Sequence, residues 1–152
     1  MNTTLASLQK LFDRDLEVLY KEIESYPSEA TLWLVKGDIK NSGGNLCLHL
    51  CGNLQHFVGT ILGKTGYVRN RDAEFADKNV PRAKLLGEIR ATQTAVKNTL
   101  ANLDPSTLEK DYPINVFGEP MTTNFFLIHL EAHLNYHRGQ VNYHRRLVAI
   151  SD

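Results

Sequence analysis

Four histidines near the end of the chain share one face of a predicted helix. They lie in the stretch FFLIHLEAHLNYHRGQVNYHRRLVAI, at steps of four, four and seven residues: His129, His133, His137 and His144. Residues three, four or seven apart are neighbours on a helix, so these imidazoles form a stripe. Two histidines one turn apart can bind a single metal ion, and a third from another helix completes a site with open positions. The spacing therefore indicates either a metal site or a core that must pair several buried imidazoles.

Apolar residues assign this stripe to the buried side of its helix. At about 100° per residue, four of them lie within about 60° of His133: Phe126, Leu130, Leu147 and Val148. Tyr136 and Gln140 fall on the same side, where each could hold a ligand imidazole through a hydrogen bond. Charged residues occupy the far side, which we expect to face solvent: Glu131, Arg138 and Arg146.

A second polar stripe is predicted on the helix that contains LHLCGNLQHFVG. His49, Asn53 and His56 fall on one side of this helix, whereas Cys47 and Cys51 fall with apolar residues on the other. If His49 faces the last helix, three imidazoles converge, and Asn53 could fix the orientation of one of them. The two cysteines are predicted to be reduced packing residues, because a disulfide within one helical turn is strained. The choice between His49 and His56 as the third ligand stays open on these patterns alone.

Two common kinds of metal enzyme are disfavoured by the same residues. The stretch HLNYH has leucine where the general-base glutamate of a HExxH zinc protease would stand. The stripe also carries no Asp or Glu, so a ferritin-like dinuclear carboxylate site is not expected.

Composition excludes several classes of partner. The 152 residues include 17 basic and 17 acidic side chains, so no net charge attracts nucleic acid or an anionic membrane. The N-terminal stretch lacks the pattern of a signal peptide, and no apolar run approaches the roughly 20 residues that span a bilayer. We therefore expect a cytoplasmic protein that binds neither nucleic acid nor membrane.

The rest of the chain predicts one all-α domain, residues 1–152, folded as a four-helix bundle. Amphipathic periodicity and caps predict helices over residues 1–25, about Gly44–Leu62, Pro81–Leu103 and about Asn124–Ile150. A cap at Asn41 or Ser42 begins the second, and a threonine begins the last. The polar residues 66–80 are expected to form a long crossing loop without an element of their own. The run YPINVFG is compatible with a short hairpin before the last helix.

Three motifs together resemble the DinB-like superfamily. They are LHLCGNLQHFVG, YVRNRDAEF and HLNYHRGQVNYHRRL, which match the bacterial branch with HLxGNL and HxxxHRGQ motifs. The resemblance implies a four-helix bundle that binds zinc or nickel through His49, His133 and His137. It leaves His56 and His129 as neighbours of the site, and it implies a homodimer.

Characterised members of this superfamily transfer low-molecular-weight thiols such as bacillithiol or mycothiol. The resemblance thus implies an enzyme with a small-molecule substrate: a metal-dependent thiol S-transferase, or one that uses a metal-bound water in the manner of a hydrolase. Arg69 and Arg71 could bind a carboxylate of the substrate. Either arginine could instead pair with Asp72 or Glu74 and order the loop. The alternative function is a non-catalytic stress or damage-response protein whose metal is structural or absent.

Overall fold

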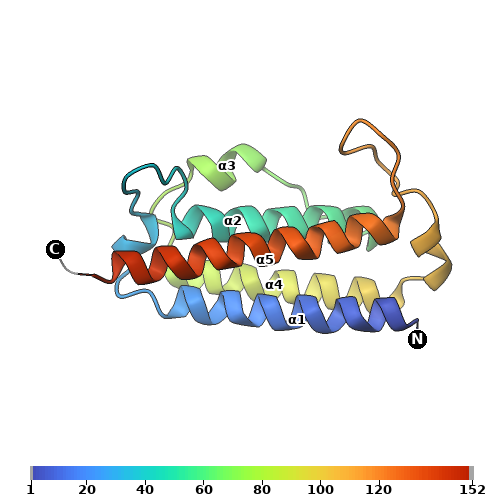
Figure 1. The fold of residues 1–152 in the computed structure, drawn as a ribbon, viewed down its shortest axis with the longest axis horizontal. Helices are drawn as coiled ribbons and strands as arrows, with labels where there is room; N and C mark the ends of the chain where they lie inside the picture. Colours follow the sequence, from blue (N-terminus) through green and yellow to red (C-terminus); the bar gives the residue numbers. More distant parts are fainter. Residues whose placement is uncertain (1, 151–152) are drawn as a thin grey trace.

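Four long helices form a bundle in the computed structural model, which describes residues 2–150 (Figure 1). They are α1 (Thr3–Glu24), α2 (Gly43–Leu54), α4 (Arg82–Asn102) and α5 (Thr123–Val148). Three short helical segments lie between them: η1 (Ala30–Trp33), α3 (Arg71–Ala76) and η3 (Pro105–Glu109). The predicted all-α bundle is confirmed, and α2 continues directly into a π-helical segment, η2 (Gln55–Leu62). No helix of the described residues is both long and apolar enough to cross a bilayer.

Side-chain caps explain where three of the four long helices begin. The side chains of Asn2, Ser42 and Thr122 each accept a backbone N–H from the first turn of α1, α2 and α5, respectively. Such caps satisfy amide groups that have no partner within the helix. Of the two predicted caps for the second helix, Ser42 is therefore the correct one.

The arrangement of the bundle places α2 beside α5. Figure 1 shows these two helices side by side on one side of the molecule, with α1 and α4 on the other and α3 lying over α2. The apolar side of α2 and of η2 is buried within the chain itself, including Cys47, Cys51 and Leu54 of α2 and Val58 of η2. Both cysteines are free and buried, as predicted. A second subunit is therefore not needed to cover this side of α2.

Two expectations about the connections are wrong. The segment 66–80 contains a short helix, α3, whose N-terminus is capped by the Asn70 side chain and whose first turn carries Asp72 and Glu74. The predicted hairpin at YPINVFG is reduced, within residues 2–150, to one isolated bridge between Asp111 and Thr122. Pro113 cannot donate a ladder hydrogen bond, which removes one requirement for a regular hairpin.

A charged cluster lies between α1 and α5, on the side of α5 that the sequence periodicity predicted to face solvent. Asp15 of α1 is fully buried and accepts hydrogen bonds from Arg14 Nε at 2.8 Å and from Asn135 Nδ2 at 2.9 Å. Burial and the neighbouring Asp15 raise the pKa of the Glu131 carboxyl from its usual value of 4.5 to about 7. Arg138, 4.0 Å from Asp15, also joins the cluster. The far side of α5 therefore faces α1 at these positions.

This cluster predicts a pH-dependent contribution to stability. Because the folded protein raises the pKa of Glu131, the contribution is fully present below pH 4.5 and is lost as pH rises through about 7. In metal-free protein, Glu131→Gln should therefore gain stability relative to the parent between about pH 5 and pH 8, by roughly 1 kcal/mol for a partly exposed carboxyl. Urea unfolding of both proteins at pH 5 and at pH 8 measures the difference between their free energies of unfolding. A difference that does not change with pH would refute the assignment.

Candidate metal centre

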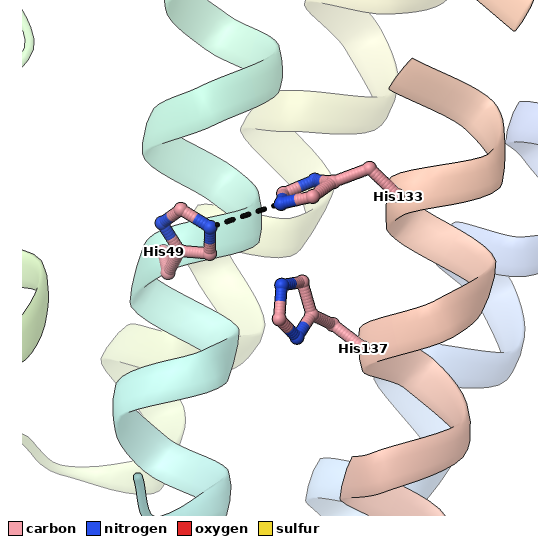
Figure 2. A group of neighbouring side chains, drawn as sticks. All are labelled: His49, His133 and His137. Carbon is pink, nitrogen blue, oxygen red and sulfur yellow. Dashed lines mark hydrogen bonds between the residues drawn. The ribbon is translucent and has the colours of Figure 1, made fainter. Parts of the chain in front are cut away.

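Three histidines from two helices converge on one point between α2 and α5. Figure 2 shows His49 on α2 facing His133 and His137 on α5, and one ring nitrogen of each lies within 4.8 Å of the others. The Nε2 atoms of His49 and His133 are 3.1 Å apart. Two nitrogens bound to one tetrahedral ion at about 2.0–2.1 Å would be about 3.3 Å apart. The three histidines could therefore hold a metal ion.

Hydrogen bonds on the outer side of two rings fix which nitrogen faces this point. Nδ1 of His49 lies 3.1 Å from Oε1 of Glu74, and Nδ1 of His137 lies 2.7 Å from Oε1 of Gln140. Both oxygens are acceptors, so each Nδ1 carries the proton and donates it. In a neutral imidazole only one nitrogen carries a proton, so the Nε2 lone pair of His49 and of His137 is then available to a cation at the shared point.

The electrostatics of the site favour neutral imidazoles. Burial is the main cause that lowers the pKa of His133, to about 3. Repulsion from the positive charges that His137 and His49 carry when protonated lowers it further. Burial also lowers the pKa of His137. Both rings are therefore neutral at pH 7, the protonation state in which imidazole binds a metal.

Hydrogen bonding within the protein does not satisfy this cluster. When both rings are neutral and His49 carries its proton on Nδ1, the 3.1 Å contact between the two Nε2 atoms is a hydrogen bond only if His133 Nε2 donates. Nδ1 of His133 is buried and has no hydrogen-bond partner among the described residues. His137 Nε2 adds a third acceptor to the same point. A cation there would be bound by all three lone pairs, so the residues fit a divalent metal.

A carboxylate that sequence patterns did not assign to the site orients His49. Glu74 on α3 is buried and forms a bidentate pair with Arg69, whose Nε and Nη2 each lie 2.8 Å from a carboxylate oxygen. Burial acts to raise the pKa of Glu74, but hydrogen bonds from His49 and Arg69 lower it overall. Glu74 is thus ionised and holds the Nδ1–H of His49. Of the two roles considered for Arg69, the pairing with Glu74 is the one found.

The glycine of the LHLCGNL motif, Gly52, lies on α2 near the candidate ligand His49, and contact with Glu74 explains why this residue is a glycine. A Cβ atom at Gly52 would lie 2.0 Å from Oε2 of Glu74, so only glycine admits the carboxylate at this place. Asn45, one turn before His49, donates from Nδ2 to the backbone oxygens of Glu74 and Asp77, at 2.9 Å each. The residues of LHLCGNL therefore supply the histidine and also the surface on which α3 lies.

Other residues predicted near the site contact it in different ways. Gln140 holds His137 as expected. Tyr136 is 64% exposed, and its hydroxyl accepts a hydrogen bond from Gln140 Nε2 and not from an imidazole, although its ring lies edge-on to that of His137, 5.1 Å between centroids. Tyr136 lies at the limit of the side of α5 that we expected to be buried, and neighbouring residues do not cover its side chain there. Asn53 forms no hydrogen bond to a histidine, and its buried Oδ1 has no hydrogen-bond partner in the part of the chain that the structure describes. Arg71 lies over the ring of Phe75, without a carboxylate partner among residues 2–150.

The remaining histidines lie outside the group of three. His56 packs against Phe57, and His129 stacks on the ring of Phe126 at 5.9 Å between centroids. His144 is a core residue: its Nδ1 bonds the Tyr26 hydroxyl at 2.7 Å and its Nε2 bonds the Leu34 carbonyl at 2.8 Å. The stripe on α5 therefore combines two candidate ligands with two packing histidines.

A cavity of about 470 Å³ opens beside the three histidines. Besides them it is lined by Asn41, Asn53, Phe57, Arg69, Arg71, Phe75, Val116, Phe117, Phe126, His129 and Leu130. This volume is within the range of about 300–1,000 Å³ that small-molecule sites occupy. The site is therefore accessible to a small molecule.

Comparisons with known proteins identify the family. Residues 2–152 match the family model described as "Protein of unknown function (DUF1572)". The chain belongs to this family. The family is DinB-like, so the resemblance found in the motifs is confirmed.

A solved structure supports the same fold. The crystal structure of a DinB-like protein from Bacillus cereus matches with a TM-score of 0.68 and 19% sequence identity, over 90% of this chain and 87% of that one. At this identity the likeness shows the fold alone. No curated protein matches the chain.

Proposed function

We propose that the protein binds zinc or nickel through His49, His133 and His137 and acts as a low-molecular-weight-thiol S-transferase. The observation that carries the proposal is the pair of outer hydrogen bonds, which direct the Nε2 lone pairs of His49 and His137 to one point. Three neutral ligands leave the full positive charge on the ion, so a bound thiol or water would lose its proton near neutral pH.

The protein residues have separate tasks in this proposal. Glu74, held by Arg69, orients His49, and Gln140 orients His137, so the ligand geometry is set before a substrate arrives. The adjoining cavity leaves room for a thiol such as bacillithiol and for the molecule that accepts it. A homodimer, which the resemblance implies, remains a prediction.

One observation favours a non-catalytic protein as the second candidate. No Asp or Glu among the described residues lines the cavity, and Glu74 is engaged by both Arg69 and His49. No carboxylate is therefore free to transfer a proton within the cavity. A stress or damage-response protein with a structural metal would have the same features.

Cobalt substitution separates the two candidates. Co²⁺ should bind at one equivalent per chain, and bacillithiol should then add a sulfur-to-metal charge-transfer band, because a three-ligand site keeps a position open. Titration of the Co²⁺ protein with bacillithiol, followed by ultraviolet and visible absorption, measures this. Stoichiometric Co²⁺ without a thiol band would favour the structural metal. Failure to bind Co²⁺, Zn²⁺ or Ni²⁺ would refute the metal site itself.

A further inference from the structure

We propose that the cavity beside the three histidines binds a small carboxylate with an aromatic or apolar body, and that Arg71 pairs with its carboxylate. This inference rests on the proposed function, since it names the substrate class of that same site. It depends on three features of the cavity: its aromatic wall, its uncompensated positive charge and a buried amide without a partner.

Aromatic rings form much of the wall. Phe117, from the segment before α5, is 55% exposed and lies edge-on to the ring of His129, 4.9 Å between centroids. On the α3 side, the ring of Phe75 lies 4.9 Å from that of His49. Burying the exposed part of such a ring against an apolar or aromatic ligand is favourable. The body of the ligand should therefore lie between Phe117 and Phe75.

The charge of the cavity favours an anion. Within residues 2–150, two arginines and no acidic residue line it, and the charge of Arg69 is neutralised by its bidentate pair with Glu74. Arg71 has no carboxylate within ion-pair distance in the described part of the chain, and its guanidinium lies 5.3 Å from the centroid of Phe75. A planar guanidinium beside a ring suits a carboxylate on an apolar body, through charge-assisted hydrogen bonds.

Asn53 adds a polar contact close to the histidines. It lies one turn after His49 on α2, is 7% exposed, and its Oδ1 is buried without a hydrogen bond. An unpaired buried amide is unfavourable unless a ligand supplies the missing partner. The ligand should therefore carry a hydrogen-bond donor at its end nearest the histidines, in addition to the carboxylate at Arg71.

Two probes of nearly equal shape test whether the cavity prefers a carboxylate. 1-Naphthylacetate and its neutral amide, 1-naphthylacetamide, differ in charge and share the aromatic body. Isothermal titration of the metal-free protein should give about tenfold tighter binding of the acid. Arg71→Gln should remove that preference and leave binding of the amide unchanged, whereas Phe117→Ala should weaken both probes. Metal-free protein is used first because a carboxylate can itself bind a metal ion.

Arg146→Gln is the matched control, because Arg146 is also exposed and lies over a ring, that of Tyr143, outside the cavity. This variant should keep the tenfold preference. Equal binding of acid and amide by the parent protein, or the same loss in both arginine variants, would overturn the proposal. Metal content measured on the same samples keeps the outcomes apart. A protein that binds zinc but does not prefer the acid contradicts only this inference, whereas one that prefers the acid but binds no metal contradicts only the proposed function.

Discussion

The variants His133→Ala and His137→Ala are each expected to lose stoichiometric zinc or nickel while keeping the far-UV circular dichroism of a helical bundle. Each removes one of three converging nitrogens. Loss of a residue that merely orients a ligand costs about 10- to 100-fold in metal affinity, so loss of a ligand should cost more than about 100-fold. Neither side chain belongs to the apolar core, so the fold should persist. Elemental analysis of tag-free protein, purified without chelator, measures the metal content per chain.

His129→Ala and His56→Ala are the matched controls. His129 lies one turn before His133 on the same stripe but packs on Phe126, and His56 packs on Phe57. Both variants should keep one equivalent of metal. If His56→Ala lost its metal, the choice of His49 over His56 would be wrong. If His137→Ala kept its metal, the proposed ligand set would be wrong whichever of those two histidines is the third ligand.

The periodicity of the sequence predicted the parts of the site that lie on long helices. A helix fixes the angle between side chains, so the spacing of His133 and His137 determined that they share a face, and the wheel of the second helix directed His49 to a polar side. The same reasoning placed Glu131 in solvent, which is wrong. It assumed one buried side, whereas α5 packs against α1 as well as α2.

Glu74 could not be predicted in this way, because its position depends on contacts between distant segments. It lies on a six-residue helix within a polar stretch, 25 residues after His49, and the stretch has no periodicity that reveals a buried face. Its place is set by hydrogen bonds from Asn45 and by the space above Gly52. The sequence does allow a salt bridge between Arg69 and Glu74, but no pattern in it connects that pair to the histidine.

Gly52→Ala is expected to weaken zinc binding about 10- to 100-fold, although Gly52 has no side chain and cannot be a metal ligand itself. The added Cβ would lie 2.0 Å from Oε2 of Glu74, so the carboxylate must move and His49 loses the acceptor that fixes its Nδ1 proton. Competition for zinc with a chromophoric chelator at constant pH measures the affinity. Gly87→Ala, at a helical glycine of α4 with nothing within 4 Å of a Cβ, is the control and should bind zinc as the parent does.

A double-mutant cycle with Glu74→Ala distinguishes this mechanism from general damage to α2. Removing the carboxylate should weaken zinc binding by a similar factor, because His49 again loses its acceptor. It also removes the group with which the added Cβ would clash, so Gly52→Ala should cost nothing further in that background. Losses that add in the double variant would mean that Gly52 acts on the helix itself. If the double variant instead binds zinc as weakly as each single variant, the glycine of the HLxGNL motif acts by leaving space for the Glu74 carboxylate.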